Sequence, residues 1–123
     1  MLGGKEAIGT VAVKDLTVAR KFYEGTLGLK LEDAQGEEAQ TYRSGPSRLI
    51  VYRSQFAGTN KATALNFIVG ADIEKVVRTL KERGVTFEHY DLPGLKLEGD
   101  LHVADGFKTA WFKDPDGNII SLM

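Results

Sequence analysis

The sequence has no cysteine among its 123 residues. This absence excludes disulfides, thiolate nucleophiles and cysteine-ligated metals, and it agrees with a cytoplasmic protein. No apolar run approaches the roughly 20 residues of a membrane-spanning helix. The opening residues, MLGGKE, lack the apolar stretch of a signal peptide, so we expect neither export nor a membrane partner.

Neither sign of charge is in excess. Lys and Arg total 16 against 17 for Asp and Glu, which gives a net charge of −1. A nucleic-acid partner requires a basic surface, and we therefore expect no nucleic-acid binding. The chain is 42% hydrophobic and 27% charged, a globular balance, and its length fits one domain over residues 1–123.

A pattern repeats once, offset by about half the chain. In the first copy, alternation predicts a strand over residues 8–13, with Val11 and Val13 on one face. Asp15 is the expected N-cap of a helix whose apolar residues recur at helical spacing. Gly28 ends this helix, and residues 29–32 form the next expected strand.

The second copy follows the same order. A strand is expected over residues 65–69, and Asp72 is the candidate N-cap of the helix after it. The apolar stripe of that helix consists of Ile73, Val76, Val77 and Leu80. Gly84 ends the helix, and residues 85–88 form a strand.

Two further strands complete each copy. In the first they span 39–44 and 47–53, and in the second 108–113 and 118–123, where the DPDG sequence at 114–117 predicts a hairpin turn. Each half is therefore βαβββ: module one is about 7–54, the connection 55–62, and module two 63–123. Residues 91–106 are expected to be either a lid or a long loop.

These motifs resemble those of the vicinal oxygen chelate superfamily. The resemblance rests on VAVKDL at 11–16, FY at 22–23 and LGL at 27–29, together with FKDPDGN at 112–118 and IISL at 119–122. The superfamily includes glyoxalase I, extradiol dioxygenases, fosfomycin resistance enzymes and bleomycin resistance proteins. The resemblance implies an α+β fold, with two βαβββ modules forming curved mixed sheets around a cleft, and a homodimer.

Enzymes of this superfamily hold a divalent metal with inward-pointing side chains. Carried over from the resemblance, the ligand positions fall on Ile8, Val51, Ala64 and Ser121, with Leu65 or Asn66 in place of Ala64 if an insertion is placed differently. Aliphatic side chains cannot bind a metal, and a serine hydroxyl is a poor ligand. We therefore predict no metal and no cofactor.

Other residues are candidates to line the cleft. Thr10 and Ser121 would add hydroxyls, and Asn66 would either orient a ligand or bond to backbone. Trp111 would stack on a planar ligand or lie in the core or a dimer interface, and Phe56 would line the cleft or cap the core. The predicted ligand-binding set is Ile8, Thr10, Val51, Phe56, Ala64, Asn66, Trp111 and Ser121.

Three charged or titratable residues have less specific interpretations. Arg53 would meet a ligand carboxylate or stay solvated at a strand end. One histidine would act as a general base, or the pair would bind an ion, but their spacing matches no metal motif. We favour the simpler interpretation, in which His89 ends a strand and His102 lies in a loop.

These candidates favour metal-independent binding, by sequestration, of a small apolar or planar molecule such as an antibiotic. The alternative is a lyase, isomerase or dioxygenase of the same superfamily, acting on a small metabolite with an unrecognised metal site or none. A third interpretation is a dimerisation domain whose cleft is filled by its own side chains.

Overall fold

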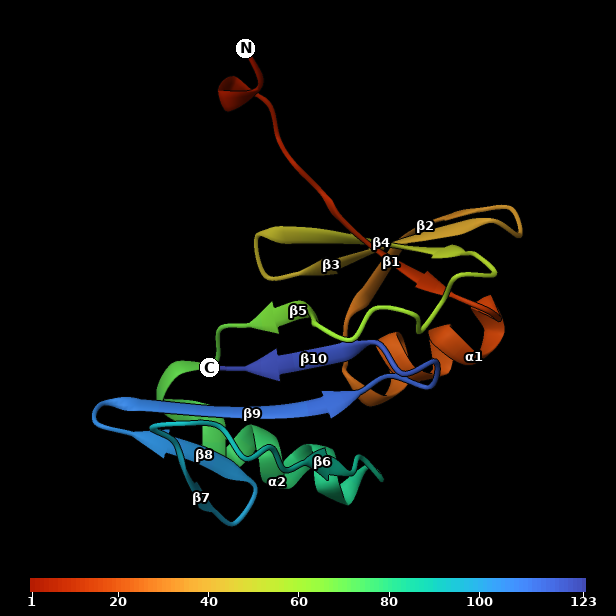
Figure 1. Ribbon diagram of the computed structural model, residues 1–123. Helices are drawn as coiled ribbons and strands as arrows, with labels where there is room; N and C mark the ends of the chain where they lie inside the picture. Colours follow the sequence, from red (N-terminus) through yellow and green to blue (C-terminus); the bar gives the residue numbers. More distant parts are fainter. The chain divides into compact units, whose positions relative to one another are not determined.

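The computed structural model describes the backbone of residues 1–123 and the side chains of residues 1–34 and 36–123. The chain divides into two compact units, Met1–Gly58 and Thr59–Met123 (Figure 1). This division falls inside the predicted connection, residues 55–62. The expected α+β class is confirmed, because each unit combines helix with a mixed sheet.

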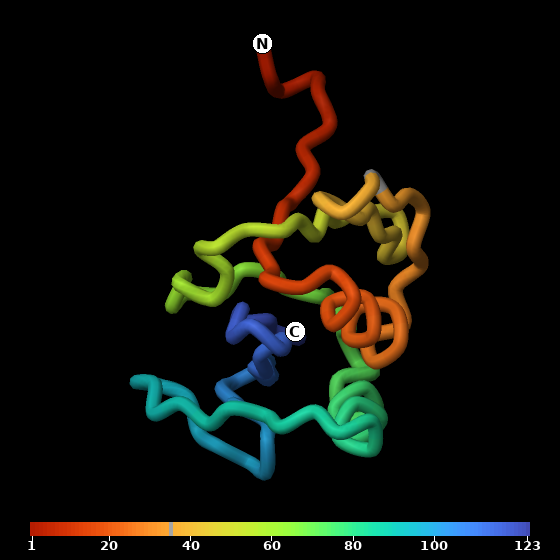
Figure 2. The backbone as a smooth tube through the Cα atoms, turned by 90° about the vertical axis from the view of Figure 1, so that its right-hand side faces the viewer, coloured from red at the N-terminus to blue at the C-terminus, as the bar shows by residue number. Residues whose placement is uncertain are grey.

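The first unit is βαβββ, as predicted. Its elements are β1 (Gly9–Val13), α1 (Leu16–Arg20) continued by a π-helical segment (Lys21–Thr26), β2 (Lys30–Gln35), β3 (Ala39–Ser44) and β4 (Ser47–Arg53). The sheet order is β1-β4-β3-β2, with β1 and β4 parallel. Figure 2 shows residues 1–8 leaving β1 as an arm, and all eight are exposed.

Local signals explain the first helix. The Asp15 carboxylate accepts hydrogen bonds from the backbone N–H groups of Thr17 and Val18, at 2.8 and 3.2 Å, which confirms the predicted N-cap. Gly28 has a φ of 78°, a conformation that costs glycine little, and the helical segment ends before it. Beneath the helix, Tyr23 and Tyr42 are fully buried, with ring centroids 6.1 Å apart.

The second unit repeats this plan with an added hairpin. Its elements are β5 (Thr63–Phe67), α2 (Ile73–Glu82), β6 (Phe87–Glu88), β7 (Lys96–Glu98), β8 (Leu101–Ala104), β9 (Phe107–Lys113) and β10 (Ile119–Leu122). The sheet runs β5-β10-β9-β8-β7, and β6 also pairs with β9. Strands β5 and β10 are parallel.

Two expectations for this unit hold only in part. Residues 96–104 are not loop, because β7 and β8 form a hairpin that extends the sheet, whereas residues 91–95 are irregular. Glycines and charges on these short strands obscure their alternation. Asp72 does occupy the N-cap position of α2, but its side chain accepts no capping hydrogen bond, because a 3₁₀ turn, Gly70–Asp72, leads directly into the helix.

The predicted turn between β9 and β10 is confirmed. Asp114 Oδ1 accepts from the backbone N–H groups of Asp116 and Asn118, each at 2.9 Å, and Gly117 has a φ of 92°. This turn fixes the register of β10 against β9, and so it decides which side chains share a face. Within the described residues, no helix combines the length and apolar character needed to cross a membrane.

Candidate functional site

A row of side chains crosses the sheet of the second unit. Asn66 on β5 lies opposite Ser121 on β10, which lies opposite Trp111 on β9. Directly paired residues point to the same face of a sheet, so the three share one face. The neighbouring residues Phe112 and Ile120 are fully buried on the other face, towards α2.

Hydrogen bonds hold this row in place. The Ser121 hydroxyl donates to Asn66 Oδ1 at 2.8 Å, and Trp111 Nε1–H donates to the Thr63 hydroxyl at 3.2 Å. Ser121 is only 7% exposed, whereas Asn66 is exposed and Trp111 half-buried. We call Thr63, Asn66, Ser121 and Trp111 the polar row; it offers one indole surface and one amide group to a ligand.

An aromatic cluster continues the same face beyond Trp111. The ring centroid of His102 lies 4.9 Å from that of Trp111 and 6.1 Å from that of Tyr90, and the Tyr90 and Trp111 centroids are 5.4 Å apart. We call these three residues the aromatic wall. His102, on β8, is 1% exposed, so its interpretation as a loop residue is wrong.

The signal for His102 was present in the sequence. Leu101 and Val103 flank it, an alternation typical of a strand. The short segment lies among glycines and charges, however, which favoured a loop.

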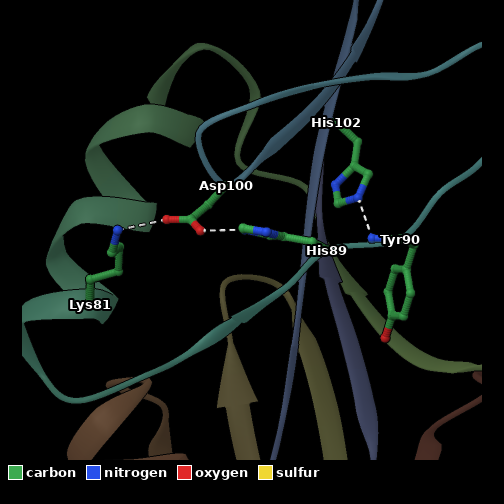
Figure 3. Close-up of polar contacts among 5 residues, drawn as sticks. All are labelled: Lys81, His89, Tyr90, Asp100 and His102. Atoms are coloured by element: carbon green, nitrogen blue, oxygen red, sulfur yellow. Dashed lines mark hydrogen bonds and ion pairs between the residues drawn. The ribbon is translucent and has the colours of Figure 1, made fainter.

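A hydrogen bond determines which ring nitrogen of neutral His102 carries the proton. Its Nε2 accepts from the backbone N–H of Tyr90 at 2.9 Å (Figure 3). The neutral ring therefore carries its proton on Nδ1. Among the described residues, His102 Nδ1 and the Tyr90 hydroxyl are buried without a hydrogen-bond partner. Burial, and then the Glu88 carboxylate, raise the pKa of Tyr90 above its ordinary value.

The second histidine takes part in a charged cluster. His89 Nε2 lies 2.8 Å from Asp100 Oδ1, and Lys81 Nζ lies 2.7 Å from Asp100 Oδ2 (Figure 3). Hydrogen bonds from Lys81, and then from His89, lower the pKa of Asp100. The cluster ties the β7–β8 turn to α2 and to the end of β6.

In the first unit, one predicted position is wrong. Val51 pairs with Val11, is fully buried and faces the helix side, so it does not share a face with Thr10. Ile50 takes that place, because it pairs with Thr10 as Ser121 pairs with Asn66. The error is one residue, since strand faces alternate at every position.

The other candidates of this unit are exposed. Ile8 precedes β1 and is 38% exposed, and Phe56, in the turn after β4, is 67% exposed. Arg53 forms an ion pair with Glu38 at 2.8 Å, as expected of a solvated strand end. That Ile8, Thr10 and Phe56 contact a ligand stays a prediction.

The residues present do not fit the metal site that the resemblance implies. Ile8, Ile50 and Ala64 have no donor atom in their side chains, and the Ser121 hydroxyl is engaged with Asn66. Within the part of the chain that the structure describes, no three His, Cys, Asp or Glu side chains gather as metal ligands. This donor set lacks the imidazole and carboxylate groups that divalent metals prefer.

An open groove of about 830 Å³ lies elsewhere in the second unit. It runs beside the start of α2 and the β8–β9 turn and is lined by Ile73, Val103, Phe107 and Met123 among others. The ion pair between Glu74 and Lys108, at 2.8 Å, borders it. None of the predicted ligand-binding residues lines this groove.

Comparison with known proteins explains the fold. The model of the Glyoxalase/Bleomycin resistance protein/Dioxygenase superfamily matches residues 8–122. The chain belongs to this superfamily. A sequence search of curated proteins found no match to this chain.

Solved structures share its fold. A glyoxalase family protein from Enterococcus faecalis has a TM-score of 0.74 at 22% identity, with 99% of this chain and 98% of that chain covered. The fosfomycin resistance protein FosX from Listeria monocytogenes, complexed with Mn(II) and sulfate, has a TM-score of 0.71 at 14% identity, covering 99% and 90%. FosX from Mesorhizobium loti has a TM-score of 0.68 at 14% identity, covering 99% and 92%. At these identities the likeness concerns the fold alone.

Proposed function

We propose that this superfamily member binds a small apolar or planar molecule without a metal and acts by sequestering it. The observation that carries the proposal is the polar row. At Ser121, a position where the resemblance implies a metal ligand, a hydroxyl is bonded to an amide, and an indole lies beside it. Such a surface suits a planar ligand, which stacks on the indole while a polar edge meets the amide.

The Asn66 amide supports this orientation. Its oxygen accepts from Ser121, and among the described residues no hydrogen bond uses its nitrogen. The NH₂ group is therefore available to a ligand carbonyl or ether oxygen. Burial of the ligand would stabilise the complex by about 25 cal/mol per Å² of apolar area before ordering costs are subtracted.

The alternative is an enzyme of the same superfamily, a lyase, isomerase or dioxygenase acting on a small metabolite. Its chemistry would need a metal site other than the superfamily's positions, or no metal. Elemental analysis of the purified protein separates the two functions. We expect no stoichiometric Zn, Ni, Mn or Fe; a stoichiometric ion removed only by a chelator contradicts metal-independent binding.

We further propose a cytoplasmic homodimer. Sedimentation velocity checks the dimer, which should have twice the 13.5 kDa mass of the chain. A monomer at all accessible concentrations contradicts it.

Equilibrium dialysis tests the binding function directly. The protein is dialysed against uncharged planar hydrophobic compounds, with N-phenyl-1-naphthylamine as the first probe. We expect saturable binding, which Trp111→Ala weakens by about tenfold because the stacking surface is lost. Ile68→Ala is the matched control, since Ile68 is 86% exposed and lies outside the polar row. No saturable ligand, or equal loss in both variants, contradicts the proposal.

A further inference from the structure

Each of the two histidines connects the segment after β6 to the region where β8 begins. Residues 89 and 90 follow β6, residue 100 precedes β8, and residue 102 lies in β8. The His89 side chain reaches Asp100, while the His102 side chain reaches the backbone N–H of Tyr90 (Figure 3). We call this pair of contacts the histidine clasp.

The two contacts respond to protonation in opposite ways. His102 Nε2 accepts a hydrogen bond, so it must be unprotonated; a second proton on the ring makes Nε2 a donor and removes the bond. His89 Nε2 faces a carboxylate, which only accepts. A proton gained by His89 adds a positive charge to the donor, which turns that contact into an ion pair and strengthens it.

The segment that follows Tyr90 has few other attachments. Residues 91–94 are exposed and belong to no strand, and the local bond there joins Leu95 N–H to the Leu92 carbonyl at 3.2 Å. Beyond its ring contacts in the aromatic wall, Tyr90 is held to the sheet by the bond to His102. By contrast, Asp100 keeps both Lys81 and His89.

We propose that the histidine clasp makes segment 90–95 a pH-controlled flap on the aromatic wall. Protonation of His102 frees Tyr90. Protonation of His89 keeps residue 89 bonded to Asp100, and Lys81 keeps Asp100 on α2, so only the segment after His89 moves. Regulation of a ligand site by this flap rests on the proposed function, whereas the movement of the flap is independent of it.

Other charged groups near His102 do not provide a substitute switch. On its own face, β6 and β9 contribute the ion pair between Glu88 and Lys113, at 3.3 Å, and Tyr90 contributes a phenol. The adjacent hairpin strand places Leu97 opposite His102. Lys81, Asp100 and His89 form the charged cluster already described.

Nuclear magnetic resonance tests the flap without a ligand, because two histidine rings and one indole give separate signals. The sample is taken from about pH 8 to about pH 5, across the ordinary titration range of imidazole. As the His102 ring titrates, the Tyr90 amide should exchange roughly tenfold faster after correction for its intrinsic rate. Trp111 emission should shift over the same pH range, because the aromatic contacts loosen.

Two substitutions assign the effect. His102→Asn keeps an acceptor for the Tyr90 N–H but has no titrating ring. In this variant, acidification should no longer accelerate exchange of the Tyr90 amide. His89→Asn is the matched control and should leave this acceleration in place. An acceleration that survives His102→Asn, or constant Tyr90 protection while the wild-type His102 ring titrates, overturns the flap. If His102→Asn does not fold, the wild-type measurement decides alone.

Binding of N-phenyl-1-naphthylamine, which stays uncharged over this range, separates the flap from the proposed function. We expect severalfold tighter binding in acid for the wild type and no change for His102→Asn, since freeing Tyr90 exposes Trp111. If the probe binds equally well at both pH values although exchange of the Tyr90 amide accelerates in acid, the flap does not regulate the site. No saturable binding at either pH counts against the proposed function while the flap stands.

Discussion

Single side chains position this protein's polar groups through specific partners. The buried Tyr42 hydroxyl donates to Gln40 Oε1 at 2.7 Å, and burial raises the pKa of Tyr42 to about 12. The Ser121 hydroxyl likewise donates a hydrogen bond to the amide oxygen of Asn66. The first bond joins two residues of β3, and the second depends on the register between β5 and β10.

Tyr42→Phe tests the value of one such bond. The substitution keeps the ring but leaves Gln40 Oε1 buried without its donor, so the free energy of unfolding should fall by about 1–2 kcal/mol. Urea denaturation measures the change. Tyr52→Phe is the control, since Tyr52 is 39% exposed, whereas Tyr42 is fully buried. Equal losses would mean that the Gln40 bond contributes nothing particular.

The sequence predicted the face of individual side chains correctly where polar and apolar residues alternate along a strand. The prediction was wrong where they do not. The cleft-side candidates Asn66, Ser121 and Trp111 do share one face of the second sheet. Val51 does not face the side of Thr10, because β4 is apolar at 49, 50 and 51 and hence gives no alternation from which to choose a face.

At the scale of elements, the two helices begin differently although the sequence presents an aspartate at each start. Asp15 has extended backbone geometry and caps α1, whereas Asp72 has a φ of −84° and a ψ of 4° and makes no side-chain cap. The preceding residues decide this, since Gly70–Asp72 already turns as a 3₁₀ helix.

Replacing each aspartate by alanine separates the two helix starts. Asp15→Ala should lower the free energy of unfolding by about 1 kcal/mol, because two N–H groups of α1 lose their acceptor. Asp72→Ala should cost much less, the remaining effect being the interaction of its charge with the helix dipole. Thermal or urea unfolding of both variants provides the comparison. A larger loss for Asp72→Ala would contradict the cap assignment.

The added hairpin is the element that the sequence concealed. Strands β7 and β8 have three and four residues, and their hydrogen bonds depend on β9, which lies later in the chain. Local propensity carries little information about so short a strand. Consequently His102, and with it the aromatic wall, was missed.

For the whole molecule, the charged cluster predicts how stability depends on pH. The pKa of Asp100 is lower in the folded chain than in the unfolded one, because Lys81 and His89 bond to its carboxylate. The unfolded state therefore takes up a proton first on acidification. The stabilisation is present above the ordinary aspartate pKa and is lost as pH falls through the folded value, below about pH 4.

Asp100→Asn tests this dependence. Near neutral pH the variant should unfold more easily than the wild type, and the difference should narrow below about pH 4. Urea midpoints measured over the acid range provide the readout. Asp105→Asn, an exposed aspartate in the β8–β9 turn, should leave the wild-type curve unchanged. A difference that persists at low pH would show that Asp100 acts through packing rather than charge.

The sequence by itself determined the superfamily, the βαβββ repeat, the Asp15 cap and the DPDG turn, because these depend on neighbouring residues and on regular alternation. It also showed that Ile8, Val51 and Ala64, three of the four positions where the resemblance implies a metal ligand, carry aliphatic side chains, which follows from residue identity. Only the tertiary structure decided that Ile50 rather than Val51 shares a face with Thr10, and that Tyr90, His102 and Trp111 form one cluster. Those features depend on register between strands distant in sequence, where one residue reverses a side chain's face.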